Sequence, residues 1–197
     1  MAIALAFADP VHDAQKTFRA VMNALARPGT LQPVHGLAAA PAPLTPVAAA
    51  VAVALADYET PLWLDLPLTA APEVTTYLTF HTGARIVSAA SQSAFALVAA
   101  PEALPDLTGF ALGTDVYPDR STTLVLQVTS LTEGPRFRLA GPGIKGETFL
   151  AVAGLPTDII ARLAANHALF PRGVDLILAG PQGVAALPRT TRVTSEA

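Results

Sequence analysis

A glycine-rich segment, residues 141–146 with the sequence GPGIKG, combines a flexible backbone with one basic side chain. Turns of this kind can direct several backbone N–H groups toward an anion, and the ammonium group of Lys145 would add a positive charge. The spacing matches neither the phosphate-binding loop nor the dinucleotide-binding pattern, and residues 148–152 have the character of a strand. An anion-binding turn and an ordinary hairpin turn both remain open, and the pattern alone favours the hairpin turn.

Two segments near the C-terminal end, residues 170–178 (FPRGVDLIL) and 188–191 (PRTT), carry opposite charges. Antiparallel pairing across a turn at residues 180–183 would bring Asp175 close to Arg189, and we predict that their charged groups lie within about 6 Å of each other. In one interpretation the two residues form a structural ion pair. In the other, Arg189 and two hydroxyl groups, one of them on Thr190, are offered to a phosphate-like group. The sequence favours neither interpretation.

Other residue types that could support chemistry give weaker patterns. Asp57 and Glu59 could act as an acid and a base or hold a metal, but a polar turn before a strand is the commoner explanation. The four histidines are far apart in sequence and lack the spacing of a metal site, and the absence of cysteine excludes thiolate nucleophiles and cysteine-ligated metals. We therefore predict no metal site.

Charge is distributed unevenly along the 197 residues. Residues 1–119 contain 4 basic and 10 acidic groups, whereas residues 120–197 contain 8 basic and 5 acidic groups. This asymmetry is either chance clustering on a solvated surface or the mark of a surface that faces an anion or a partner. We expect any ligand contact in the basic C-terminal part rather than around Asp57 and Glu59. The candidate anion contacts are Arg138, Gly141, Gly143, Lys145, Arg172, Arg189 and Thr190.

Hydrophobic periodicity and proline-marked helix starts predict the elements that carry these residues. We expect helices from Pro10 to about residue 27 with an apolar face of Phe18, Val21, Met22 and Leu25, at 46–56 as a buried helix, from Pro72 onward, and at about 156–167. We expect strands at residues 61–64, 95–98, 122–128 and 136–139, and a hairpin of 174–178 with 184–187. Helices that alternate with strands and are followed by hairpins predict an α/β domain around a mixed sheet.

The chain is expected to form one domain, residues 1–197, without a membrane segment. The longest apolar run, residues 47–56, has about half the length that a bilayer requires, and no basic residue precedes the short apolar N-terminal run as in a signal peptide. These features predict a cytoplasmic protein. Basic residues do not alternate with aromatic ones in any run, which argues against nucleic-acid binding.

Taken together, the short motifs resemble those of the PhnH family, the H subunits of the bacterial carbon–phosphorus lyase core complex. The resemblance covers essentially the whole chain and is most specific at residues 170–178 and 188–191. The other matching motifs are DAQ at 13–15, FR at 18–19, RPG at 27–29, LAD at 55–57, ETP at 59–61, FHT at 80–82 and GPGI at 141–144.

This resemblance implies a three-layer α-β-α sandwich with a mixed sheet, similar to the large domain of pyridoxal-phosphate-dependent transferases but without that cofactor. The two lysines of the chain support the last expectation. Lys16 is on an apparently amphipathic helix and Lys145 is in a glycine turn, whereas a Schiff base requires a lysine in a protected pocket. We predict no cofactor.

The resemblance also implies a role in phosphonate catabolism. There the G, H, I and L proteins together replace the purine of ATP with an alkylphosphonate, giving a ribose 1-phosphonate 5-triphosphate that the J subunit cleaves. We expect a non-catalytic or substrate-positioning subunit whose partners are the G, I, J and L proteins, above all the I subunit, and which forms a homodimer when isolated. The alternative is a nucleotide- or phosphonate-binding transferase with an active site of its own.

Overall fold

The computed structural model describes residues 6–196 and contains a seven-stranded mixed sheet in the order β1-β9-β8-β5-β4-β2-β3. The strands β2, β3, β4, β5 and β8 are parallel, and β9 and β1 extend the sheet in antiparallel pairings. The bounds of the strands are β1 (Gln32–Pro33), β2 (Leu62–Leu64), β3 (Ile86–Val87), β4 (Phe95–Val98), β5 (Thr123–Gln127), β8 (Asp175–Gly180) and β9 (Gly183–Leu187). The predicted α/β class with a mixed sheet is confirmed.

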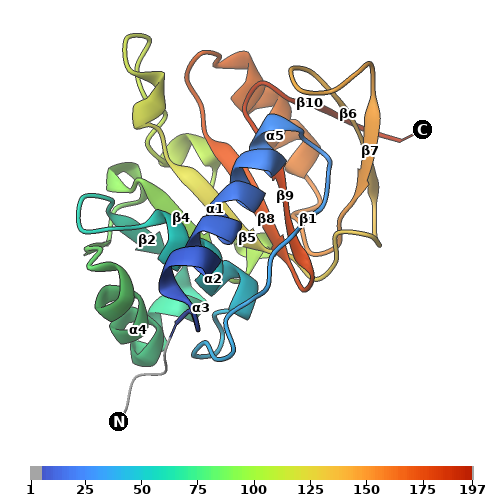
Figure 1. The fold of residues 1–197 in the computed structure, drawn as a ribbon. Helices are drawn as coiled ribbons and strands as arrows, with labels where there is room; N and C mark the ends of the chain where they lie inside the picture. Colours follow the sequence, from blue (N-terminus) through green and yellow to red (C-terminus); the bar gives the residue numbers. More distant parts are fainter. Residues whose placement is uncertain (1–5, 197) are drawn as a thin grey trace.

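A second, three-stranded antiparallel sheet has the order β10-β6-β7 and lies at the side of the molecule (Figure 1). Its strands are β6 (Arg136–Ala140), β7 (Thr148–Ala151) and β10 (Arg192–Ser195). The strands at residues 136–139 and 148–152 were expected from the sequence. The strand β10 was not expected, because its residues are mostly polar and exposed and it is held by its pairing with β6.

Five helices are described: α1 (Pro10–Ala26), α2 (Pro46–Leu55), α3 (Leu66–Thr69), α4 (Pro72–Thr82) and α5 (Ile159–Ala168). The predicted starts of the first three long helices are confirmed, because a proline occupies the first turn of each of them. Asp9 caps α1 by accepting hydrogen bonds from the N–H groups of Val11 and His12. The last helix begins at Ile159, slightly later than expected.

The two faces of the large sheet bury separate apolar cores. Because side chains alternate along a strand, Val125 and Ile177 face α1, α2 and α4, while Leu124 and Leu176 face the opposite side. On that opposite side the covering layer consists of α5, short 3-10 turns and the three-stranded sheet. Figure 1 shows α1 across the first face, in front of β8 and β9.

The helix α2 is buried as its composition predicts. Ala48, Ala49 and Ala50 have no exposed surface, and the helix packs between α1, α4 and the strands β5 and β8. Small side chains allow this close approach. The buried side of α1 differs from the expectation, because Phe18 and Met22 are about half exposed at 48% and 49%.

The buried residues of α1 are Thr17, Ala20, Val21 and Ala24. Mostly small residues therefore form the buried side of α1, which contacts the alanine-rich α2, whereas Phe18 and Met22 are half exposed. Of the expected apolar face, Val21 is buried and Leu25 packs partly against the core, whereas the expectation was wrong for Phe18 and Met22.

None of the helices within residues 6–196 combines the length and the apolar character that a bilayer span requires.

Candidate functional site

Arg189 and Asp175 form the predicted ion pair at the open end of the β8–β9 hairpin. Nη2 and Nε of Arg189 lie 2.5 and 3.1 Å from the two carboxylate oxygens of Asp175. The remaining guanidinium N–H groups donate to Pro118 O at 3.0 Å, to Pro171 O at 3.3 Å and to Ser121 Oγ. All five donors of Arg189 are thus engaged within the protein. Arg189 has no N–H group left for an anion.

The backbone groups of Arg189 also form hydrogen bonds within the chain. The hairpin register, Leu176 opposite Leu187, brings Asp175 next to the end of β9, where the backbone N–H of Arg189 also donates to Asp175 Oδ1 at 2.8 Å. Nδ1 of His167, near the end of α5, lies 2.9 Å from the carbonyl oxygen of Arg189. The Arg189 side chain is 11% exposed. This cluster fastens the loops that precede β5 and β8 to the hairpin.

Arg172 is at the surface near this cluster and has an acidic partner. Its Nε lies 3.4 Å from Asp115 Oδ1, and the two side chains are 44% and 79% exposed. Asp115 neutralises part of its charge. The candidates Arg172 and Arg189 therefore belong to ion pairs in the loops at the amino ends of the parallel strands.

The glycine turn at residues 141–146 is anchored against the end of α1. A Cβ atom on Gly143, whose φ is 81°, would overlap the carbonyl oxygen of Ala26, and one on Gly141 would lie 2.8 Å from Thr190 O. A Cβ atom on Gly29 would lie 2.7 Å from Leu139 and 2.8 Å from Thr148 of the three-stranded sheet. The motifs at 27–29 and 141–144 are therefore two sides of one contact.

Several groups of this turn remain available to an anion. Ile144 N donates to Gly141 O at 3.1 Å, which closes the turn. Within residues 6–196, the backbone N–H groups of Gly143, Lys145 and Gly146 have no hydrogen-bond acceptor, and the Lys145 side chain is exposed. The turn thus combines three free amides with a cation.

Arg138 lies on the strand that leads into this turn. Its Nη1 is 3.8 Å from Glu147 Oε1, and its buried Nε has no partner among the described residues. Of the seven candidate residues, Arg138, Gly141, Gly143, Lys145 and Thr190 belong to the three-stranded sheet and its adjoining turns. The other two, Arg172 and Arg189, belong to the ion pairs described above, and Arg189 directly precedes Thr190 along the chain.

The acidic turn after α2 is bonded within itself. Asp57 Oδ1 accepts a hydrogen bond from Glu59 N at 2.9 Å, and Thr60 Oγ1 accepts one from Asp57 N. Among residues 6–196, no group of three or more His, Asp or Glu side chains could hold a metal ion.

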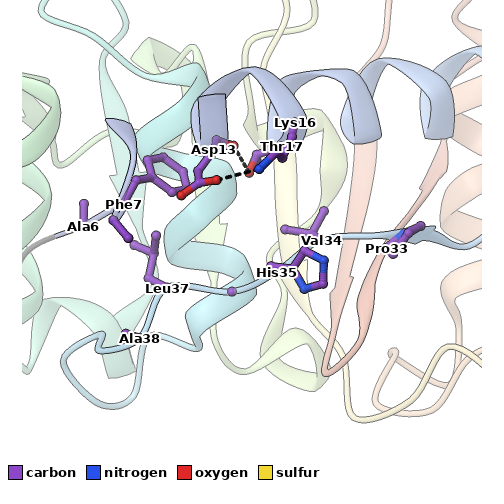
Figure 2. Close-up of a pocket in the computed structure, with 12 residues that line it drawn as sticks. Ala6, Phe7, Asp13, Lys16, Thr17, Pro33, Val34, His35, Leu37 and Ala38 are labelled. Carbon is purple, nitrogen blue, oxygen red and sulfur yellow. Dashed lines mark hydrogen bonds and ion pairs between the residues drawn. The ribbon is translucent and has the colours of Figure 1, made fainter. Parts of the chain in front are cut away.

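A hollow of about 330 Å³ beside α1 was missed by the sequence analysis (Figure 2). Phe7, Val34 and Leu37 contribute apolar surface, and Asp13, Lys16 and His35 line it as well. Lys16 Nζ lies 3.0 Å from Asp13 Oδ1. The hollow unites residues from α1 with the segment at 33–38, and no local pattern could have signalled it.

Asp65 was also missed, although it is a buried carboxylate at the end of β2. Its Oδ2 accepts hydrogen bonds from Ala99 N and Ala100 N at 2.7 and 2.9 Å, and its Oδ1 accepts one from Leu68 N at 3.3 Å. Burial raises the pKa of the Asp65 carboxyl above its usual value, against the effect of these amides. With both oxygens occupied by backbone, Asp65 joins the end of β2 to the loop after β4.

Comparison with known proteins agrees with the resemblance seen in the motifs. The chain is 45% identical over 193 residues to the alpha-D-ribose 1-methylphosphonate 5-triphosphate synthase subunit PhnH of Rhizobium meliloti (strain 1021), covering 97% of this chain and 95% of that protein. It is 43% identical over 82 residues to the putative C-P lyase subunit protein HtxG of Stutzerimonas stutzeri, covering 42% of each chain. Residues 5–194 match the family described as bacterial phosphonate metabolism protein (PhnH), and the chain belongs to this family.

Proposed function

We propose that this chain is the H subunit of a ribose 1-methylphosphonate 5-triphosphate synthase and that it positions substrate or partners rather than carrying out the chemistry. The observation that carries the proposal is the 45% identity to a synthase subunit over nearly its full length. The cluster around Arg189 supports a positioning role, because all the guanidinium donors of Arg189 are engaged by bonds within the chain.

The glycine turn is the proposed contact for a phosphonate or triphosphate group. Free amides of Gly143, Lys145 and Gly146 can donate to anionic oxygens, and the Lys145 ammonium adds charge. Arg138 lies on the adjoining strand with only a distant acidic partner, and Thr190 borders Gly141. Arg172 and Arg189 are less suited to the role, because each is engaged by an aspartate.

A chemical-shift titration with ATP and with methylphosphonate tests this contact. We expect the amide signals of Gly143, Lys145 and Gly146 to shift, and the shifts to shrink in the double variant Arg138→Ala, Lys145→Ala. The control is Lys16→Ala, which removes an exposed lysine on α1 instead. Saturable shifts around Asp13 and His35, with the turn unaffected, would favour the alternative of a transferase whose own active site is the hollow beside α1.

Complementation tests the proposed role in cells. A strain that lacks its own H subunit should regain growth on methylphosphonate as sole phosphorus source when it produces this chain. Growth should be slower with the Arg138→Ala, Lys145→Ala variant, while both strains should grow equally on phosphate. Failure of the folded, expressed chain to restore growth in a strain of the same organism would contradict the proposal.

We propose the G, I, J and L proteins as partners, with the I subunit as the principal one, and a homodimer in their absence. An exposed apolar stripe on α1 supports self-association: Val11, Phe18 and Met22 are 63%, 48% and 49% exposed and share one face of the helix.

We also propose that the fold is similar to the large domain of pyridoxal-phosphate-dependent transferases and that this chain does not bind pyridoxal phosphate. Lys16 lines the hollow beside α1 but is exposed and paired with Asp13, and Lys145 is exposed in the glycine turn, so both lack the protection that a Schiff base requires. Because ATP is the expected co-substrate, we place the activity in the cytoplasm.

A further inference from the structure

The strand β7 forms one edge of the three-stranded sheet, as Figure 1 shows on the outer side of the molecule. Just beyond the ends of β7 and β6, Val152 N donates to Pro135 O at 3.1 Å. These two opposite residues therefore form a hydrogen-bonded pair of the antiparallel ladder. Backbone groups alternate in direction along an antiparallel strand. Leu150 therefore points its N–H and C=O toward β6, and Phe149 and Ala151 point theirs outward.

The outward direction is already used at the next position along the chain. Ala153 N donates to Ser130 O at 3.1 Å, and Thr129 N donates to Ala153 O at 3.0 Å. The chain then turns away, because Thr132 N donates to Ser130 Oγ. Within residues 6–196, the outward N–H and C=O groups of Phe149 and Ala151 have no hydrogen-bond partner. The outer edge of β7 is therefore unpaired beyond Ala153 and can accept another strand.

The other sheet edges are less available. The strands β1 and β3 at the two ends of the large sheet have two residues each, which limits what they could pair with. The strand β10, at the opposite edge of the small sheet, packs against α5. An exposed edge of four residues such as β7 is the kind of site at which a partner adds a strand.

The face beside this edge is basic. Arg138 is opposite Phe149 and Arg136 is opposite Ala151, so these side chains share the outer face, and Arg192 joins them from β10. The Arg136 guanidinium lies 5.0 Å from the centre of the Phe149 ring, which is 41% exposed. Glu196 lies 3.0 Å from Arg136, and Glu147 lies 3.8 Å from Arg138. These two carboxylates only partly neutralise the charge of the three arginines.

We propose that an extended, acidic segment of another synthase subunit adds to the edge of β7 as a fourth strand. Backbone hydrogen bonds to Phe149 and Ala151 would supply the attachment, and acidic side chains of the segment would face the Arg136 guanidinium beside Phe149. A second copy of this chain is a poor occupant, because β7–β7 pairing would bring the arginines of two copies together. The inference rests on the proposed function, which makes the chain a subunit.

The test uses the complex that forms when this chain is produced together with the other subunits from the same organism. Ala151→Pro removes an outward N–H without removing a bond to β6, and Ala151→Ser keeps that N–H as its control. Arg136→Glu reverses a charge beside the edge, and Arg85→Glu reverses an exposed charge directly before the distant strand β3. Urea unfolding of each isolated variant establishes that it folds.

We expect Ala151→Pro and Arg136→Glu each to weaken assembly at least about tenfold, and the two controls to assemble like the parent chain. Amide hydrogen exchange at Phe149 and Ala151 should slow in the parent complex relative to the isolated chain, which tests the edge even if the proline variant fails to fold. Assembly that is unaffected by both variants, with unchanged exchange at these amides, would overturn the inference and leave the proposed function intact. Slowed exchange in the isolated chain that depends on its concentration would overturn it in favour of a second copy. No assembly of the parent chain with the other subunits would overturn both.

Discussion

At the scale of single residues, the ion pair of Asp175 with Arg189 decides how the C-terminal loops are held. The two side chains are only 23% and 11% exposed, and the guanidinium also binds three loop residues. Removing one partner of a buried pair leaves the other charge and its neighbours without compensation. The role of Arg189 is therefore structural, and its loss should appear in stability before it appears in ligand binding.

Arg189→Ala should lower the free energy of unfolding by about 3–5 kcal/mol. Arg172→Ala is the matched control, because Arg172 also pairs with an aspartate but is 44% exposed, and should cost at most about 1 kcal/mol. Urea denaturation followed by circular dichroism measures both. Equal losses in the two variants would contradict the assignment of Arg189 to the fold.

At the scale of elements, the turn at residues 141–146 depends on its contact with the end of α1. Gly143 and Gly146 both have a positive φ, 81° and 76°, but only Gly143 lies against another segment, since no atom lies within 4 Å of a Cβ on Gly146. Both substitutions to alanine strain the backbone by about 1–2 kcal/mol. Gly143→Ala should therefore cost clearly more stability than Gly146→Ala in parallel urea titrations. If the two variants lose the same stability, the contact with Ala26 is not what requires Gly143.

The carboxylate of Asp65 links β2 to the loop after β4 and should make stability depend on pH. Because burial raises its pKa in the folded chain above the ordinary value of 3.8, the folded chain binds this proton more tightly than the unfolded chain does. The resulting stabilisation is present below the unfolded pKa and is lost as the pH rises through the folded pKa.

The reference for this measurement is Asp65→Asn, which cannot ionise. Its amide NH2 group would face either Leu68 N or the pair Ala99 N and Ala100 N, each of them a donor, so the variant should be less stable by about 1–3 kcal/mol overall. The difference in unfolding free energy, parent minus variant, should decrease from about pH 4 to pH 7 in urea titrations. A difference that grows with pH would mean that the amides, rather than burial, dominate the pKa of Asp65.

The sequence predicted those elements whose signals are local. Pro10, Pro46 and Pro72 marked helix starts, and the residues 180–183 marked the β8–β9 turn. The predicted apolar face of α1 was right for Val21 and wrong for Phe18 and Met22, because small residues make up most of the side that packs against α2. Asp65 and the hollow beside α1 were missed, because each depends on segments distant in sequence. The Asp175–Arg189 pair was predictable because a hairpin fixes which residues meet.

At the scale of the whole molecule, the exposed stripe of Val11, Phe18 and Met22 supports the proposed self-association. Phe18→Asp should convert the isolated protein from a dimer to a monomer in light scattering at micromolar concentration. Phe80→Asp, at a phenylalanine that is 66% exposed on α4, should remain a dimer. A monomeric parent chain, or a Phe18→Asp variant that remains dimeric, would contradict the proposed interface.

Reconstitution of the synthase from purified subunits tests the central claim most directly. The reaction is started with ATP and methylphosphonate, with and without this chain, and the ribose 1-methylphosphonate 5-triphosphate product is followed by ³¹P NMR. We predict product from the full set of subunits, little or none when this chain is omitted, and none from this chain alone. Undiminished product formation without the chain, or turnover by the isolated chain, would contradict its role as a positioning subunit.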